Sequence, residues 1–203
     1  MQPARFDAVV AELAPITAEF ARAGRRLYIV GGTVRDLLLG RDLAALDFDF
    51  TTDAQPDEVK SLLGGLVDAL WTQGERFGTI AAKRGERTLE ITTHRAEAYV
   101  PDSRKPEVEF ADDITVDLSR RDFTVNALYY DPSSQTVLDY HDGVADLKHK
   151  TLRMIGDPRS RYREDPVRML RAVRLSAKLG LTLDPAVRAP IHDMADQIGR
   201  AHV

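Results

Sequence analysis

The chain has 203 residues, of which 43% are hydrophobic and 30% are charged, and its formal net charge is −4. This composition is ordinary for a globular protein and excludes a basic, nucleic-acid-binding surface over the whole molecule, so such a surface must be local. The absence of cysteine excludes disulfide-linked partners and thiolate metal sites. Since the sequence has no run of about 18 apolar residues and no signal-peptide segment, we expect a cytoplasmic protein without a membrane span.

The first part of the chain predicts a helix, a strand and a glycine turn. Residues 6–23 carry apolar side chains at helical spacing, and residues 27–30 (LYIV) have the pattern of a buried strand. Gly31 and Gly32 end this strand, and a short helix follows. The amides at the start of that helix are expected to bind a phosphate, with Arg35 as a second phosphate ligand.

The next predicted strand carries two acidic side chains on one face. Because alternate residues of a strand share a face, Asp47 and Asp49 are expected to point one way, while Leu46, Phe48 and Phe50 point into the core. Two adjacent carboxylates repel each other unless a cation lies between them, and Mg²⁺ prefers oxygen ligands. A solvated acidic pair is the alternative for an isolated Asp-x-Asp pattern, but the preceding glycine turn and helix favour a catalytic magnesium site.

The strings GGTVRD and DFDFTT together resemble the head of the class II tRNA nucleotidyltransferases, the CCA-adding enzymes of the polymerase-β-like superfamily. Bacterial poly(A) polymerases share this signature. The resemblance implies an α+β (α/β) head with a mixed sheet flanked by helices, followed by an all-α neck. It also implies transfer of CMP and AMP, from CTP and ATP, to the 3′ end of tRNA by a two-magnesium mechanism.

A strand hairpin is expected over 79–83 and 88–92, after a Trp71 that is expected to pack against the core. Its second strand carries Glu90 in the string EITTHR, which is similar to the context of the family's third acidic residue. A solvated glutamate remains the alternative. The string GERFGTI is similar to the CCA-adding form rather than to bacterial poly(A) polymerases.

A polar, proline-containing loop is predicted after this hairpin. In the family, a mobile loop with a similar pattern helps to change the specificity from CTP to ATP. The residues of this chain that match the pattern are Tyr99, Asp102, Arg104 and Pro106.

The string SRRDFTVNALYYD, residues 119–131, is the second strong motif. Arg120 and Arg121 are expected at a helix start, where a planar guanidinium suits phosphate oxygens. Asn126 is expected to hydrogen-bond the ribose or the backbone. The pattern R-R-D-F-T-x-N-A is specific to the resembled family, and the resemblance implies Arg121 as the nucleotide ligand ahead of Arg120.

A helix is predicted from about Asp165 to Leu179, with Asp165 and Arg168 as neighbours on one face. An ordinary surface ion pair is one explanation of this spacing. The other is base recognition, because an aspartate acceptor and an arginine donor match the Watson–Crick edges of cytosine and adenine but not those of uracil and guanine. The resemblance implies base recognition, since EDPVRMLRAVR matches the family's template motif, with Arg171 and Arg174 steadying the template or the phosphates.

These motifs predict a catalytic head over residues 1–150 and a helical neck over residues 151–203. Family members continue into helices that bind tRNA, and the chain is expected to end before them. A poly(A) polymerase, or an enzyme that adds only C or only A, is the alternative activity. A catalytically silent fragment that binds nucleotide or RNA is the alternative from another functional class.

Overall fold

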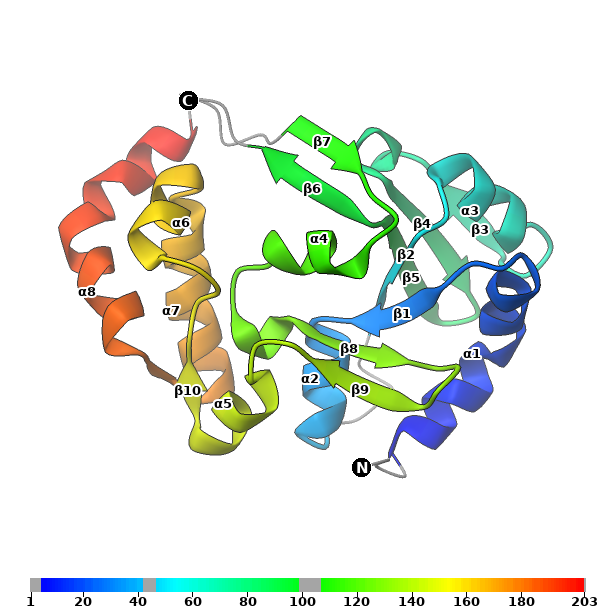
Figure 1. The fold of residues 1–203 in the computed structure, drawn as a ribbon, viewed down its shortest axis with the longest axis horizontal. Helices are drawn as coiled ribbons and strands as arrows, with labels where there is room; N and C mark the ends of the chain where they lie inside the picture. The colour runs from blue at the N-terminus through cyan, green and yellow to red at the C-terminus, as the bar shows by residue number, and fades with distance from the viewer. Residues whose placement is uncertain (1–4, 42–46, 99–106, 203) are drawn as a thin grey trace.

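The computed structural model describes residues 5–41, 47–98 and 107–202 (Figure 1). Its α-helices are α1 (Arg5–Arg22), α2 (Gly32–Leu38), α3 (Pro56–Leu63), α4 (Ile114–Ser119), α5 (Gly143–His149), α6 (Pro158–Glu164), α7 (Val167–Leu179) and α8 (Pro185–Met194). Its strands are β1 (Leu27–Val30), β2 (Phe48–Thr52), β3 (Ala69–Trp71), β4 (Thr79–Arg84), β5 (Arg87–Thr93), β6 (Arg95–Ala98), β7 (Glu107–Phe110), β8 (Leu128–Asp131), β9 (Thr136–Asp139), β10 (Thr151–Leu152) and β11 (Thr182–Leu183). The 3₁₀ turns are η2 (Glu75–Phe77), η3 (Thr124–Asn126) and η4 (Ala195–His202). Within these ranges, no helix is long and apolar enough to cross a membrane.

The strands form one large mixed sheet and two small sheets. Over the described residues, the large sheet has seven strands in the order β3-β4-β5-β2-β1-β8-β9. Strands β2 and β5 are parallel, and the other neighbouring pairs are antiparallel. The pairs β6–β7 and β10–β11 make the small sheets. The predicted mixed sheet and the predicted β4–β5 hairpin are therefore confirmed.

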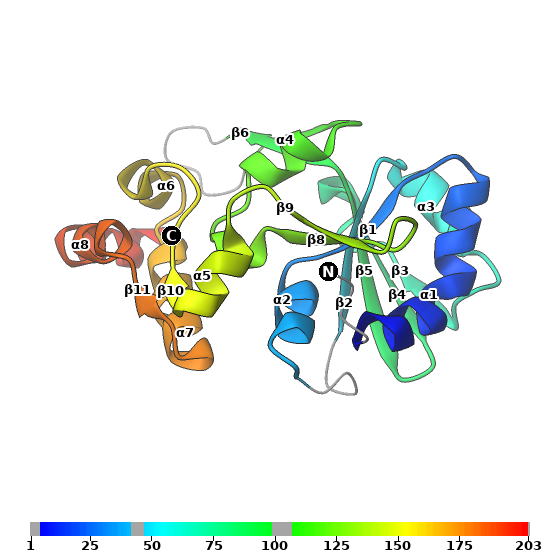
Figure 2. The same ribbon diagram turned by 60° about the horizontal axis from the view of Figure 1, so that its bottom comes forward.

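Strand β1 is buried on both faces, because a cluster of packed side chains covers each face of the sheet there. Ile29 packs in the main core with side chains of α1 and α3, whereas Tyr28 and Val30 pack in a second cluster with side chains of α4. Figure 2 shows α1 and α3 on one side of the sheet and α6, α7 and α8 on the other. Since Phe50 pairs with Ile29 and side chains alternate along a strand, Phe50 faces the main core and Asp49 faces the α4 side.

A short backbone seam joins the sheet to the C-terminal helices. The amide of Thr124 donates to the carbonyl oxygen of Arg153 at 3.0 Å, and the amide of Ile155 donates to that of Asp122 at 2.9 Å. The main apolar cluster also continues across this seam into α6, α7 and α8. The domain boundary near residue 150 stays a prediction.

The single helix expected from about Asp165 is wrong at its start. Helix α6 ends at Glu164, and α7 begins at Val167. Asp165 lies between them in an extended conformation, with φ −146° and ψ 98°. The cause is Pro166, because a proline sterically disfavours the helical conformation of the residue before it.

Two further local expectations are wrong. Arg120 and Arg121 do not begin a helix but follow the end of α4, whose start is capped by the Asp113 carboxylate through the amide of Thr115 at 2.8 Å. Trp71 does not pack in the core, since 43% of it is exposed at the end of the edge strand β3. Strand propensity alone does not distinguish an edge strand from a central one.

Candidate nucleotide-binding and catalytic site

A pocket of about 530 Å³ lies between the sheet and α7. Its walls come from the β1–α2 turn, β2, the segments that follow α4 and α6, and α7. Residues that the sequence singled out make up most of the lining, namely Gly31, Gly32, Arg35, Asp49, Arg120, Arg121, Asn126, Asp165, Arg168, Arg171 and Arg174. The fold therefore brings segments that are far apart in the sequence to one cavity.

The glycine turn allows one of these arginines to lie close to the backbone. Gly31 has φ 68°, in the left-handed region that favours glycine, and a Cβ at this position would lie 3.7 Å from Nη1 of Arg121. The Gly31 amide donates to the carbonyl oxygen of Leu128 at 3.0 Å, so this amide joins the turn to β8 rather than facing the pocket. The guanidinium of Arg121, which the sequence predicts as the phosphate ligand, lies beside this turn.

Arg35 is held in the pocket wall by two side chains. It is almost fully buried, its Nε donates to Oδ1 of Asp36 at 2.8 Å, and its Nη1 donates to Oδ1 of Asn126. The amide oxygen of Asn126, which the sequence assigned to ribose or backbone, therefore accepts a hydrogen bond from Arg35. These contacts fix the orientation of a cation that lines the same pocket as Asp49.

Strand β2 presents its acidic side chains as expected from its alternation. Phe48 and Phe50 are buried in the core, Asp49 between them is half-buried, and Asp47 is exposed. The hydroxyl of Thr33 donates to the backbone carbonyl oxygen of Asp47 at 2.9 Å, which fastens the start of β2 to α2. Asp49 lines the pocket, whereas Asp47 comes just before β2 and is not part of the pocket lining.

The carboxylate of Asp49 lies in a strong electrostatic field. Burial raises its pKa to about 6, with further upward contributions from Glu90 and Asp47, and the cations Arg121 and Arg35 act in the opposite direction. Glu90 pairs with Asp49 in the register of the parallel strands β2 and β5, so the two side chains share a face. The arrangement concentrates negative charge beside the two guanidiniums.

This donor set fits a magnesium ion that is shared with a substrate. Over residues 5–41, 47–98 and 107–202, no group of three or more His, Asp or Glu side chains could hold a metal ion by itself. Mg²⁺ commonly takes only one or two carboxylates, and substrate phosphates and water complete its oxygen shell. Asp47 and Asp49 supply the two carboxylates of such a site, and Glu90 adds negative charge beside the buried Asp49 that a cation would relieve.

A buried carboxylate that the sequence reasoning missed orients both arginines after α4. Asp117 is fully buried; its Oδ1 lies 2.6 Å from Nη2 of Arg120, and its Oδ2 lies 2.9 Å from Nη2 of Arg121. The hydroxyl of Tyr129 donates to the same Oδ2 at 2.7 Å. Burial raises the pKa of Asp117, but the charges of Arg121 and Arg120 outweigh burial and hold it well below the ordinary value. The spacing of four residues between Asp117 and Arg121 is the signal that could have found it.

The two predicted base-reading residues line the same pocket but are not neighbours on one helix. Arg168 is 3% exposed, and its Nη1 donates to Oε2 of Glu164 at 2.7 Å and to the carbonyl oxygen of Arg161 at 3.0 Å. Asp165 uses Oδ1 to accept from the amide of Val167 at 3.1 Å, at the start of α7. The expected Asp165–Arg168 helical pair is replaced by a Glu164–Arg168 pair with Asp165 beside it.

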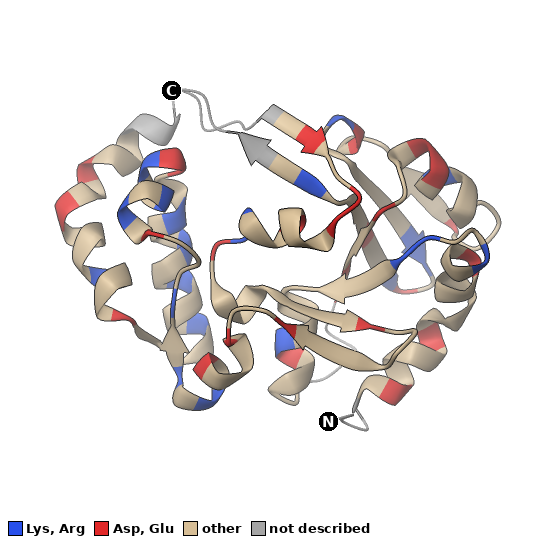
Figure 3. Cartoon of the chain, in the orientation of Figure 1, with Lys and Arg blue, Asp and Glu red and all other residues tan. Residues whose placement is uncertain are grey.

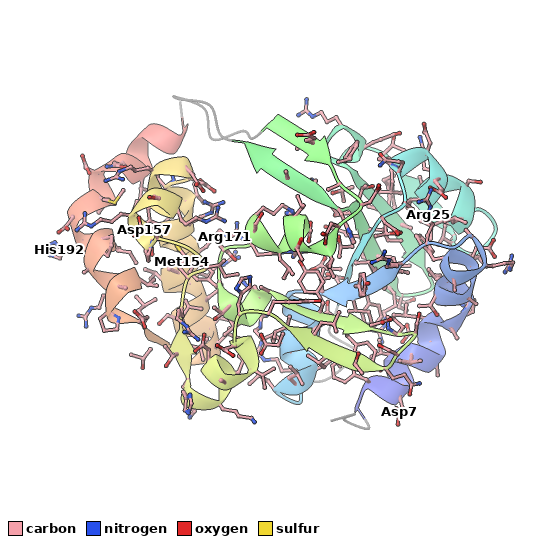
Figure 4. All side chains as sticks on the ribbon, viewed as in Figure 1. Asp7, Arg25, Met154, Asp157, Arg171 and His192 are labelled. Atoms are coloured by element: carbon pink, nitrogen blue, oxygen red, sulfur yellow. The ribbon has the colours of Figure 1, made fainter. Side chains whose placement is uncertain are left out.

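Helix α7 adds a row of cations along the pocket. Figure 3 shows Lys and Arg following one another along α7, and Arg171, Arg174 and Lys178 line the cavity. Nη2 of Arg171 lies 2.7 Å from Oδ2 of the buried Asp122, and Figure 4 shows Arg171 between α7 and the sheet part of the molecule. This ion pair joins the helix to the segment that carries Arg121.

The structure leaves some predicted residues outside the pocket lining. Asp47 is not part of it, and Glu90 lines an adjacent cavity of about 400 Å³. Leu46 falls outside the described residues. So do the residues that match the family loop, Tyr99, Asp102, Arg104 and Pro106. The chemical roles assigned to all the site residues stay predictions.

Comparison with known proteins agrees with the motifs. Residues 27–153 match a family model described as the poly A polymerase head domain. The chain is 40% identical over 190 residues to the CCA-adding enzyme of Levilactobacillus brevis, covering 93% of this chain and 46% of that enzyme. It is also 40% identical over 190 residues to poly(A) polymerase I of Haemophilus influenzae, covering 89% of this chain and 41% of that enzyme.

A solved structure supports the same relationship. The crystal structure of the Bacillus stearothermophilus CCA-adding enzyme in complex with CTP superposes with a TM-score of 0.81 and 31% identity, over 99% of this chain and 46% of that chain. The chain thus spans less than half the length of the curated relatives named above. Because the family model covers well over half of its residues, this chain belongs to the poly(A) polymerase head domain family of nucleotidyltransferases.

Proposed function

We propose that this chain is a magnesium-dependent nucleotidyltransferase that adds CMP and AMP, from CTP and ATP, to the 3′ end of tRNA in the cytoplasm. The main support is one cavity that combines buried guanidiniums, the Asp49 carboxylate and the Asp165–Arg168 segment. The triphosphate and the base of one nucleotide can therefore be bound in the same cavity, beside the Asp49 carboxylate. The CCA-adding enzymes among the relatives, at about 40% identity, support the same activity.

In this proposal, Arg35 and Arg121 bind the triphosphate oxygens, and their carboxylate partners Asp36 and Asp117 keep them oriented. The terminal 3′-oxygen attacks the α-phosphorus, and the bond to the bridging oxygen of pyrophosphate breaks. Asp47 and Asp49 would hold Mg²⁺, which when bound activates the hydroxyl and stabilises the leaving pyrophosphate. Glu90 adds negative charge next to Asp49 on the same face.

Base selection is assigned to the segment between α6 and α7. The Asp165 carboxylate accepts from the exocyclic amino group of cytosine or adenine, and Arg168 donates to the ring acceptor. Uracil and guanine present a carbonyl where Asp165 needs a donor, so the site rejects them. Glu164 orients Arg168, and Arg171 and Arg174 steady the segment and the phosphates.

Incubation of the chain with tRNA that lacks its CCA end, and with each labelled nucleoside triphosphate in turn, tests the proposal. We expect incorporation of C and then A, but not of U or G. Asp47→Ala is expected to abolish incorporation and to leave the circular dichroism spectrum unchanged, whereas Asp57→Asn, on an exposed helix start, serves as a matched acidic control. Turnover retained in Asp47→Ala would reject the assignment of the carboxylates.

Poly(A) synthesis is the second candidate, because poly(A) polymerase I of Haemophilus influenzae is as similar to this chain as the CCA-adding enzymes are. The number of nucleotides added separates the two activities, since CCA addition stops after a fixed short sequence and poly(A) synthesis does not. Addition of C alone or A alone would identify a partial enzyme. Binding of RNA without any incorporation would instead identify a catalytically silent fragment.

A further inference from the structure

A row of side chains crosses the sheet from the candidate catalytic carboxylates to Trp71. The strand register pairs Asp49 of β2 with Glu90 of β5, Glu90 with Ala81 of β4, and Ala81 with Trp71 of β3. Because residues paired across neighbouring strands project to the same face, these four side chains form one line. Three strand spacings separate its ends, which is about 14 Å.

This line lies on the face opposite the main core. The residues that alternate with it, Ile80, Leu89 and Ile91, are fully buried among side chains of the main core. Glu90, in contrast, is exposed, and Trp71 is 43% exposed. An indole displayed on a polar face next to a reaction site is a feature that core packing does not explain.

A second cavity follows the same line and meets the nucleotide pocket. It has a volume of about 400 Å³, and its walls include Trp71, Thr79, Ala81 and Glu90. Phe77 and Arg95 line both this cavity and the nucleotide pocket, so the two hollows are adjacent. A chain-like ligand whose end reacts beside Asp49 can therefore extend along the sheet toward Trp71.

The chemistry of this face suits single-stranded nucleic acid. Proteins bind such strands by stacking bases on aromatic rings and by placing cations along the backbone. Lys83 is exposed and lies two residues after Ala81 on β4, so its side chain is on the same face. The exposed guanidinium of Arg76 lies 4.5 Å from the ring centroid of Phe77. Small Ala81 leaves room between the carboxylates and the indole.

We propose that this face binds the single-stranded 3′ end of the RNA acceptor, with the Trp71 indole stacked on a base upstream of the reacting nucleotide and Lys83 contacting a phosphate. The inference rests on the proposed function, because it locates the second substrate of that reaction. The position of the second cavity beside the nucleotide pocket and the row from Asp49 to Trp71 carry it.

Fluorescence gives a test that needs no turnover, because Trp71 is the sole tryptophan of the chain. The chain is titrated with an RNA hairpin that has a short single-stranded 3′ end, and with the same hairpin made blunt. We expect saturable quenching by the first RNA and at least a tenfold weaker response to the second. If an electrophoretic shift shows RNA binding while the fluorescence stays unchanged, the RNA does not reach Trp71 and the inference is wrong. The inference is also wrong if neither RNA binds.

Kinetics of the variants give the second test. Trp71→Ala is expected to raise KM for the RNA acceptor about 5- to 150-fold, the range expected for one lost base–aromatic stacking contact, without changing KM for CTP. Trp71→Phe keeps a stacking ring and should recover most of this loss. Tyr140→Ala, at an exposed aromatic of similar accessibility, is the matched control and should leave both constants unchanged.

The charge contribution is tested by Lys83→Gln, with Lys148→Gln on an exposed position of α5 as its control. Only Lys83→Gln is expected to make RNA binding less dependent on salt. Provided that Trp71→Ala still incorporates nucleotide, two results would overturn the inference. One is an unchanged KM for RNA, and the other is an equal rise of KM for RNA and for CTP. If the wild-type chain incorporates nothing, the proposed function fails, but the quenching experiment still decides whether RNA binds at Trp71.

Discussion

Replacement of Asp117 by asparagine removes a buried charge that two arginines share. The Asp117 side chain is fully buried, and the side chains of Arg120 and Arg121 are only 14% and 17% exposed. Removal of one partner from a buried ion pair costs about 3–5 kcal/mol, because the remaining charge is left uncompensated. Since both arginines reach the pocket, we expect the lower end, about 3 kcal/mol, for Asp117→Asn.

Urea denaturation followed by circular dichroism measures this loss of unfolding free energy. Tyr129→Phe is the matched variant, because it keeps both ion pairs and removes a hydroxyl that donates to Asp117 and accepts from Nε of Arg121 at 3.1 Å; about 1–2 kcal/mol is expected for these two hydrogen bonds. The pKa of Asp117 is held below its ordinary value of 3.8, so its stabilising contribution is present above that pH and is lost as the pH falls further. The difference between wild type and Asp117→Asn should therefore shrink in strong acid.

The same substitution tests the assigned role of Arg121. If Asp117 orients the guanidinium toward a triphosphate, Asp117→Asn should raise KM for CTP about tenfold or more, equivalent to about 1.4 kcal/mol of binding, and Tyr129→Phe should raise it less. Two results would refute the reasoning. One is a stability loss for Asp117→Asn no larger than that for Tyr129→Phe, and the other is an unchanged KM for CTP in a folded Asp117→Asn protein.

Three other predictions follow from the same contacts. In metal-free buffer, the free energy of unfolding should fall as the pH rises through about 6, because folded Asp49 keeps a proton that the unfolded state loses near 3.8. Urea titrations at several pH values measure this pH dependence. Asp49→Asn should abolish this contribution of Asp49, and added Mg²⁺ should reduce it in the wild type. Gly143→Ala should destabilise the fold by about 1–3 kcal/mol in the same assay, because its Cβ would lie 2.3 Å from the carbonyl oxygen of Thr124. Arg171→Ala removes the ion pair to buried Asp122 and should lower stability by about 1 kcal/mol, since the Arg171 side chain is 46% exposed; a loss above that of Asp117→Asn would contradict this ranking.

The parts of the fold that follow local periodicity could be predicted from the sequence. The alternation around Asp49 predicted a strand with buried Phe48 and Phe50, and the structure confirms both. The end of the strand at Gly31 and Gly32 was also predicted, and the structure places Gly31 there with φ 68°, a conformation that favours glycine. In each case the pattern that makes the prediction lies within a few neighbouring residues of the sequence.

Features decided by distant contacts could not be read in the same way. Trp71 was expected in the core, whereas its strand β3 lies at the edge of the sheet. The order of the strands decides this environment, and a single sequence does not specify that order.

The break between α6 and α7 joins the proposed base-reading residues to the proposed phosphate ligands. Arg161 of α6 donates through Nη2 to the carbonyl oxygens of Arg120 and Arg121, at 2.8 and 2.9 Å, and through Nη1 to Oε2 of Glu164 at 2.9 Å. The same Oε2 accepts from Arg168 at 2.7 Å. The backbone that carries Arg121, the proposed phosphate ligand, is thus joined to Arg168, a proposed base-reading residue, through the side chains of Arg161 and Glu164. Had α7 begun at residue 165, as the periodicity suggested, Asp165 would lie inside a helix instead of at this junction. Pro166 therefore matters for the site as well as for the fold, because it ends α6 where these contacts meet.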